Sequence, residues 1–189
     1  MPSKPELRRR SEVRRAERTE TDLREAGAAI ARHLLSWPVV NEADSIAAYL
    51  SMESEPSTWP LVEGLHERGV EVLLPVVQPD MNLQWARYEG PHALRISAFG
   101  ISEPTGELLG LDAVRGIDAI IVPGLAVDLL GHRLGRGAGC YDRALGHVDG
   151  STGRVVVLFD DEIVDTVPHE DHDQRIHNAV TPSGMRPLA

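Results

Sequence analysis

An uninterrupted apolar run at residues 119–123 constrains the fold of this chain more than any other feature. The run consists of an alanine, two isoleucines, a valine and a proline. A strand that is apolar at every position is buried on both faces, which is typical of the centre of a parallel sheet. Parallel strands need long crossover connections, so helices must lie between them in the sequence. The run therefore predicts a central parallel strand.

The rest of the chain alternates between extended and helical patterns. A helix is expected over residues 57–68, capped by Ser57 or Thr58 and ended by Gly69. Residues 4–35 favour one or two helices, and another helix is expected to begin near Tyr141, whereas residues 90–111 favour loop with short extended pieces. Further strands are expected at residues 45–50, 70–77, 83–88 and 154–159, the last one before a polar, histidine-rich tail. This alternation predicts an α/β fold, layered, with a mostly parallel sheet.

The order of strands also predicts where a ligand binds. In sheets of this kind, ligands lie beyond the carboxyl ends of the strands. We therefore expect the loops after Leu50, Val122 and Phe159 to line one crevice.

Residues 131–143 form a loop rich in glycine and arginine. Glycines at every second position from 135 to 139 let the backbone approach a ligand and present its N–H groups. Arg133 and Arg136 add forked donors for phosphate or carboxylate, and Asp142 suits a hard cation. The sequence fits neither a P-loop nor Gly-x-Gly-x-x-Gly, since Cys140 stands three residues after Gly137. The pattern favours an anion-binding loop, with a solvated flexible loop as the alternative.

Composition and charge exclude several classes of protein. The 189 residues carry a net charge of −10, which argues against general nucleic-acid binding. Residues 4–18 nevertheless hold seven basic and three acidic side chains, so a basic arm could contact a small anionic ligand. A single cysteine excludes an intrachain disulfide and fits a reducing cytosol. No apolar run approaches a membrane span and no signal-peptide core is present, so we expect a cytoplasmic protein.

Three further features have two interpretations each. Glu55 follows a predicted strand, where it either stabilises a helix N-terminus or binds a polar ligand group. The acids and histidines of residues 168–177 suggest transition-metal ligation, but their spacing matches no usual zinc pattern, and Asp173 is instead a candidate magnesium carboxylate. Cys140 could be a nucleophile, although a small hydrophobic residue in a tight loop is the preferred interpretation.

Four short motifs together resemble the 5-formyltetrahydrofolate cyclo-ligases, also called methenyltetrahydrofolate synthetases. Residues 133–142 match the family's Arg-Leu-Gly-x-Gly-x-Gly-Tyr-Tyr-Asp loop, with Cys140 in place of the first tyrosine. Lys4 through Arg8 match its Lys-x-x-Leu-Arg, and Glu55 through Thr58 its Glu-x-x-Thr. The family's C-terminal motif corresponds to Pro168, Glu170, His172, Asp173 and Thr181. The motifs cover essentially the whole chain.

The resemblance implies a Rossmann-like, three-layer single domain, residues 1–189, with a basic helical arm (1–36) and a phosphate loop (131–143). It implies ATP- and Mg²⁺-dependent cyclisation of 5-formyltetrahydrofolate to 5,10-methenyltetrahydrofolate, with ADP and phosphate released. Arg136 and Tyr141 would be catalytic, and Asp142 and Asp173 would hold magnesium. The nucleotide-binding residues implied are Lys4, Pro5, Glu6, Leu7, Arg8, Arg133, Leu134, Gly135, Arg136, Gly137, Ala138, Gly139, Cys140 and Tyr141. The folate-binding residues implied are Leu50, Met52, Glu55, Arg136, Gly137, Ala138, Gly139 and Cys140.

Two other functions remain open, and the tyrosine-to-cysteine difference favours the first of them. A non-catalytic relative could retain the glycine loop and bind a nucleotide without cyclising folate. A sugar-phosphate isomerase or transferase could use Glu55 as a base and would need no ATP. For the cyclo-ligase, the expected partners are a reduced folate and a nucleotide, with no nucleic acid and no membrane, and the expected state is a monomer or weak dimer.

Overall fold

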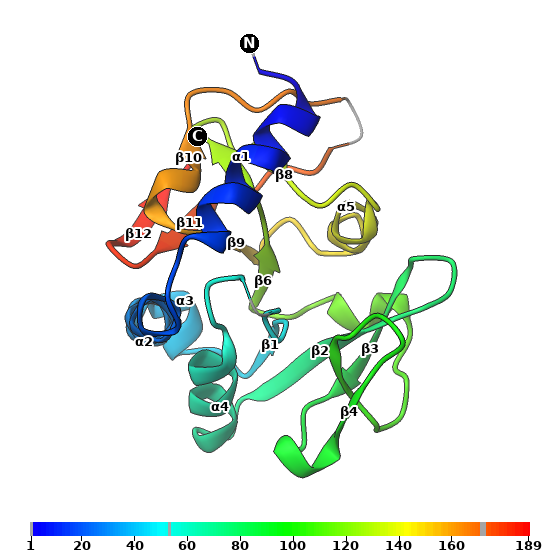
Figure 1. The fold of residues 1–189 in the computed structure, drawn as a ribbon. Coiled ribbons are helices and arrows are strands. Elements are labelled where there is room, and N and C mark those ends of the chain that lie inside the picture. The colour runs from blue at the N-terminus through cyan, green and yellow to red at the C-terminus, as the bar shows by residue number, and fades with distance from the viewer. Residues whose placement is uncertain (1, 53, 171–172) are drawn as a thin grey trace.

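A seven-stranded sheet forms the centre of the computed structural model, which describes residues 2–52, 54–170 and 173–189 (Figure 1). The strand order is β12-β11-β9-β6-β1-β2-β3. Strands β11, β9, β6, β1 and β2 are parallel, whereas β3 and β12 pair antiparallel at the two edges. Their bounds are β1 Ser45–Ala47, β2 Glu71–Val77, β3 Leu83–Arg87, β6 Ala119–Pro123, β9 Gly153–Val157, β11 Asn178–Thr181 and β12 Gly184–Pro187. The predicted α/β fold with a mostly parallel sheet is confirmed.

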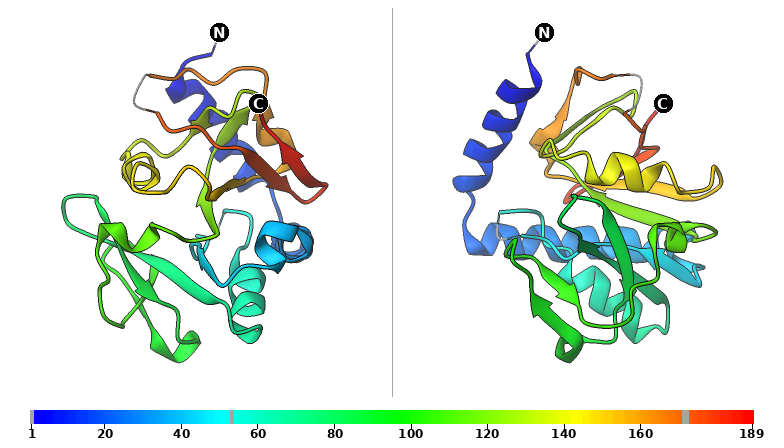
Figure 2. Two further views of the ribbon diagram at one scale, coloured as in Figure 1. Left: turned by 180° about the vertical axis from the view of Figure 1, so that it is seen from behind. Right: turned by 90° about the vertical axis from the view of Figure 1, so that its right-hand side faces the viewer.

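The apolar run of β6 lies in the middle of this sheet, as predicted. Its side chains alternate between the two faces, so Ile120 and Val122 pack in one core cluster and Ile121 in another. The Ile121 face is covered by α2 (Glu20–Ser36), α3 (Pro38–Asn41) and α4 (Trp59–Glu67). The opposite face is covered by α5 (Cys140–Leu145) and the short helix η2 (Leu111–Val114). The result is three layers, visible in the two views of Figure 2.

The short strands that follow β6 outside the central sheet were not expected. A three-stranded sheet of β10 (Ile163–Val164), β7 (Ala126–Asp128) and β8 (Arg133–Leu134) separates β6 from the glycine loop. The expectation that residues 154–159 form the last strand is wrong, because β11 and β12 follow. These strands are two to four residues long, too short for a periodic pattern to be recognised. Residues 90–111 contain η1 (Pro91–Ala93) and the pair β4 (Leu94–Ile96) and β5 (Ser102–Pro104), in agreement with the expected short extended pieces.

The segment after β1 leaves the sheet earlier than predicted. The strand ends at Ala47, and residues 48–50 continue buried but outside the ladder, toward the carboxyl edge of the sheet. Helix α4 begins at Trp59 without the side-chain cap expected from Ser57 or Thr58. The Thr58 hydroxyl instead donates a hydrogen bond to the carbonyl of Tyr49, and it accepts one from the N–H of Ser51. These bonds tie Tyr49 and Ser51 to the start of α4.

Helix α1 (Lys4–Ala16) lies against the small sheet (Figure 1). Ser3 and Glu6 cap its N-terminus reciprocally, and Leu7, Ser11 and Arg15 form its buried face at four-residue spacing. Arg15 makes a bidentate ion pair with Glu162 of the short helix η3 (Asp160–Glu162), with N···O distances of 2.7 and 2.9 Å. This pair fixes the helix on the body of the protein. Among the described residues, no helix has the length and apolarity to cross a membrane.

Candidate functional site

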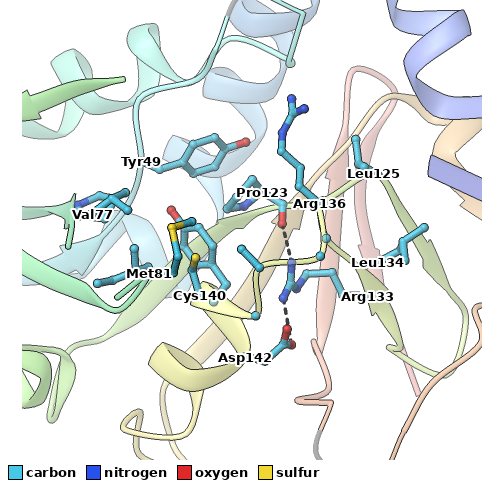
Figure 3. A pocket seen from close by; sticks show the side chains of 18 of the residues that line it. Tyr49, Val77, Met81, Pro123, Leu125, Arg133, Leu134, Arg136, Cys140 and Asp142 are labelled. Carbon is cyan, nitrogen blue, oxygen red and sulfur yellow. Dashed lines mark hydrogen bonds and ion pairs between the residues drawn. The ribbon is translucent and has the colours of Figure 1, made fainter. Parts of the chain in front are cut away.

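A pocket of about 420 Å³ lies at the carboxyl ends of β1, β2 and β6, where the glycine loop meets the sheet (Figure 3). This is the position predicted for an α/β sheet, at the point where the chain leaves the central strands in opposite directions. Its volume lies within the usual range of small-molecule sites. The described lining residues are Lys4, Arg8, Tyr49, Leu50, Met52, Glu55, Pro75, Val77, Met81, Leu83, Ile101, Ser102, Pro123, Gly124, Leu125, Arg133, Leu134, Gly135, Arg136, Gly137, Ala138, Gly139, Cys140, Tyr141, Asp142, Glu170 and Asp173.

The glycine loop needs its glycines for two different reasons. Gly137 and Gly139 have φ values of 109° and 69°, a region that other residues rarely adopt. At Gly135, a Cβ would lie 2.9 Å from Nη1 of Arg133, so a side chain there would push against the guanidinium. The loop can therefore pass close to Arg133 and begin α5 at Cys140, with its backbone exposed to the pocket.

The Arg133 side chain is buried beneath this loop and bound on two sides. Its Nη2 lies 2.9 Å from Oδ1 of Asp142, and its Nη1 donates to the carbonyl of Pro123 at 3.1 Å (Figure 3). Arg8 reaches the same loop from α1, and its Nε donates to the carbonyl of Gly135 at 2.9 Å. Two arginines far apart in the sequence thus meet at the predicted phosphate loop.

Glu55 and Arg136 form an ion pair at the mouth of the pocket. Oε1 of Glu55 lies 3.1 Å from Nη2 of Arg136, while its Oε2 accepts a hydrogen bond from the N–H of Met52 at 3.0 Å. The Glu55 side chain is 6% exposed and that of Arg136 is 47% exposed. The carboxylate is therefore fixed, and the guanidinium has room to move.

A second ion-pair group closes the pocket from the side of α1. Nζ of Lys4 lies 3.0 Å from Oδ2 of Asp173 and 3.3 Å from Oε1 of Glu170. Burial alone would lower the pKa of Lys4, but the hydrogen bonds that its ammonium group donates to these carboxylates raise it above its ordinary value. Lys4 is therefore charged at neutral pH.

Two tyrosines, Tyr49 and Tyr141, and the single cysteine also line the pocket. The rings of Tyr49 and Tyr141 lie edge to face, with centroids 6.4 Å apart. Burial and the negative charge of Glu55 raise the pKa of both phenols, so each keeps its proton and can donate a hydrogen bond. Cys140 is partly buried and packs on a core cluster, which supports the interpretation as a small hydrophobic residue.

Most of the predicted site residues meet in this pocket, but some do not line it. Leu7 packs in a core cluster, Glu6 caps α1, and Pro5 lies in the exposed first turn of that helix. The segment directly after Phe159 does not reach the pocket either, contrary to expectation; it binds α1 through Glu162, and residues 170 and 173 take its place. Thr181, on β11, donates to Asp160 and likewise lies outside the lining. His172 lies outside the described residues.

The apolar wall of the pocket was missed in the sequence. Val77, Met81, Leu83 and Ile101 come from the β2–β3 hairpin and the β4–β5 loop, and nothing in their local pattern distinguishes them from core residues. Tyr49 could have been found, because it directly precedes the predicted Leu50. The histidine-rich tail forms no group of three or more metal-ligating side chains within the described part of the chain, which gives no support to a transition-metal site.

Asp128 holds the C-terminal segment beside the pocket. Its carboxylate accepts hydrogen bonds from the N–H groups of Leu130, His132 and Val167 and lies 3.0 Å from Nδ1 of His132. The His132 ring stacks on that of His169, with centroids 3.6 Å apart. Burial alone would raise the pKa of Asp128, but the bonds from Val167 and His132 more than offset it and hold the pKa below the usual range.

We expect Asp128→Asn to lower the free energy of unfolding by about 2 kcal/mol at pH 7, because an amide directs N–H donors at backbone N–H donors. A carboxyl with a depressed pKa stabilises the fold above its unfolded pKa, about 3.9, and loses that contribution as pH falls through its folded pKa. Urea unfolding should therefore give the same difference between variant and parent at pH 5 and 7, and a smaller one below about pH 4. Asp112→Asn, at an exposed ion pair, is the matched control. If the variant and the parent already had the same free energy of unfolding at pH 5, the lowered pKa of Asp128 would be contradicted.

Comparison with known proteins identifies the family of this chain. Residues 1–182 match the model of the 5-formyltetrahydrofolate cyclo-ligase family. The chain is 41% identical over 143 residues to a 5-formyltetrahydrofolate cyclo-ligase of Mycolicibacterium smegmatis, covering 73% of each chain, and 33% identical over 173 residues to that of Escherichia coli K12, covering 90% of this chain and 95% of that protein. The NMR structure of Aquifex aeolicus 5,10-methenyltetrahydrofolate synthetase superimposes with a TM-score of 0.83 at 31% identity, over 98% of this chain and 92% of that one. The chain belongs to the 5-formyltetrahydrofolate cyclo-ligase family.

Proposed function

We propose that this protein cyclises 5-formyltetrahydrofolate to 5,10-methenyltetrahydrofolate at the expense of ATP, with Mg²⁺. One observation carries the proposal: a single pocket brings together a glycine loop, several cations and several carboxylates, beside an apolar wall. The glycine loop and the cations suit a polyphosphate. The apolar wall with a carboxylate beside it suits a flat heteroaromatic ring with polar edges. Family membership supplies the reaction.

The nucleotide side of the proposed site consists of the loop and the arginines and lysine around it. Phosphoryl transfer depends on positioning and on cations that stabilise charge at the transferring group. Arg8, Arg136 and Lys4 reach the pocket from two different elements, and the loop adds backbone N–H donors at positions without side chains. We assign the triphosphate to this side, with Arg136 on the phosphoryl group that is transferred.

The residues present fit a magnesium ion. Asp142 and Asp173 both line the pocket, and each is held by a cation, Arg133 or Lys4. Proteins that act on nucleotides usually bind Mg²⁺ through one or two carboxylates, with water and phosphate oxygens completing the shell. Bound there, the ion would neutralise charge on the phosphates.

The folate side consists of Glu55 and the apolar wall. A buried carboxylate beside Leu50 and Met52 can accept N–H donors from the edge of a pteridine, whose faces lie against apolar groups. Glu55 already binds Arg136, so this role requires Arg136 to move away. Binding of the phosphates to Arg136 would therefore release Glu55 for folate.

The proposed reaction then proceeds in two steps. The formyl oxygen attacks the γ-phosphorus, the bond to the bridging oxygen breaks and ADP leaves. N10 of the folate next attacks the formyl carbon and loses its proton, and the C–O bond breaks as phosphate departs. Arg136 stabilises the charge in the first step. Tyr141, which keeps its proton, can donate a hydrogen bond near the reacting formyl group.

An oxygen tracer tests this route. With ¹⁸O in the formyl group, the released phosphate should carry one ¹⁸O atom, in an amount equal to the methenyltetrahydrofolate formed. Unlabelled phosphate would mean that water attacks ATP and would overturn the phosphorylated intermediate. A nucleotide-binding relative would form no product, and a sugar-phosphate isomerase would not need ATP.

We further propose that residues 1–189 act as one domain, as a monomer or weak dimer in the cytoplasm.

Cys140→Ser should reduce kcat/KM by less than about fivefold, roughly 1 kcal/mol of activation free energy. The thiol packs on the core and has no chemical step in this scheme, so the loss should come only from weaker packing. Turnover of the folded variant, measured by methenyl absorbance, is the check. Complete loss of turnover would indicate a nucleophilic cysteine.

A further inference from the structure

Tyr49 carries a buried hydroxyl that has no hydrogen-bond partner among the described residues. The residue is 4% exposed and lines the pocket. In Figure 3 its ring extends over the pocket, with the hydroxyl directed to the side on which Arg136 lies. A buried polar group normally has a partner, because leaving it unpaired costs about 1–3 kcal/mol. The position of this one points to a ligand group as its partner.

The hydroxyl is suited to donate rather than accept. Burial and the charge of Glu55 raise the pKa of Tyr49 well above its ordinary value, so the phenol remains protonated. Both residues line the pocket, and Arg136, toward whose side the hydroxyl is directed, lies 3.1 Å from the Glu55 carboxylate. The pocket therefore presents a fixed acceptor, Glu55, with a donor, Tyr49, beside it.

We propose that the Tyr49 hydroxyl binds the 4-oxo group of the pteridine while Glu55 accepts its neighbouring N–H donors. This rests on the proposed function. A 2-amino-4-oxopteridine carries an amino group, a ring N–H and a carbonyl oxygen side by side along one edge, which matches two donors to a carboxylate and one acceptor to a hydroxyl. Movement of Arg136 away from Glu55 opens this edge of the site to the ring. Tyr49 is thus a specificity-determining residue for the ring substituent at position 4.

The chain offers a matched control in Tyr88. Its hydroxyl is also buried and without a described partner, and its exposure is likewise 4%, but it does not line the pocket. Its ring instead packs edge to face on His66, with centroids 5.2 Å apart. Tyr49→Phe and Tyr88→Phe remove the same atom from the same kind of environment, so a difference between them reports the pocket alone.

The experiment compares both variants with the parent protein on two ligands, 5-formyltetrahydrofolate and its 4-amino analogue used as an inhibitor. Tyr49→Phe should raise the KM for folate about tenfold and leave the KM for ATP unchanged. It should also reduce the preference for the 4-oxo over the 4-amino compound by a similar factor, because an amino group cannot accept the bond in the parent. Tyr88→Phe should match the parent in all three quantities.

Thermal unfolding without ligand separates binding from stability. Neither variant should unfold at a lower temperature than the parent, since each loses a hydroxyl without a partner. An unchanged folate KM and ligand preference in Tyr49→Phe would overturn the proposal, as would a fall in its unfolding temperature relative to Tyr88→Phe. Failure of the proposed function would appear differently, as absent turnover in the parent protein. The preference between the two pteridines would then still be measured by ligand-induced stabilisation.

Discussion

Arg136→Ala should lower kcat/KM for 5-formyltetrahydrofolate by at least about tenfold, because removal of one donor that stabilises developing charge costs about 2–4 kcal/mol. The loss should lie mainly in kcat. Arg136 binds Glu55 in the structure, so its removal frees the carboxylate, and the KM for folate should not rise. Steady-state turnover at saturating ATP measures both quantities.

Two further variants show whether the effect belongs to the guanidinium. Arg136→Lys keeps the charge but loses the forked pair of donors, so its kcat should lie between those of the parent and the alanine variant. Arg9→Ala removes an exposed arginine of α1 outside the pocket lining and should have the turnover of the parent. An Arg136→Ala protein with near-parental kcat would remove the loop arginine from the mechanism.

Glu162→Ala should lower the free energy of unfolding by about 3–5 kcal/mol, the range found when one partner of a buried ion pair is removed. The side chains of Arg15 and Glu162 are 2% and 1% exposed. Glu162 also accepts hydrogen bonds from the Ser11 hydroxyl and the N–H of Phe159. The variant removes the acceptor of these donors and leaves Arg15 charged in the interior, where its Nη2 retains a bond to the Gly124 carbonyl. Denaturant unfolding at pH 7 measures the loss.

Controls on the same short helix and on the same pair sharpen this result. Asp161→Ala removes exposed ion pairs with Arg14 and Arg18 and should change stability by less than about 1 kcal/mol. In contrast, Arg15→Met combined with Glu162→Leu removes both charges and should recover much of the stability lost in Glu162→Ala. A Glu162→Ala protein as stable as the Asp161→Ala protein would contradict the role of this pair in fixing α1.

The parts of the fold that the sequence predicted are those with a strong local pattern. The uniformly apolar β6 is typical of a central strand, and the composition of the glycine loop favoured a helix directly after it, which the structure has as α5. In β8, by contrast, one of two residues is arginine, and the stability of that strand comes from pairing with β7. Such pairings depend on distant segments, which no local window contains.

The site residues likewise fall into those that a local motif identified and those that only the fold brings together. Residue types and spacing identified Lys4, Arg136 and Asp142, because each belongs to a short motif with its own chemistry. The pairing of Glu55 with Arg136 joins residues 81 positions apart and follows only from the fold. The position of Tyr49 next to Leu50 could have indicated a pocket residue, but the role of its hydroxyl needed the structure, which shows the hydroxyl buried and without a described partner.

The measurement that tests the central claim most directly is absorbance in the methenyltetrahydrofolate band after the protein is mixed with 5-formyltetrahydrofolate and Mg²⁺, with and without ATP. The account predicts a rise that requires ATP and is proportional to the protein concentration. No rise, in folded protein that is shown to bind ATP, would contradict the account, and so would a rise that does not depend on ATP.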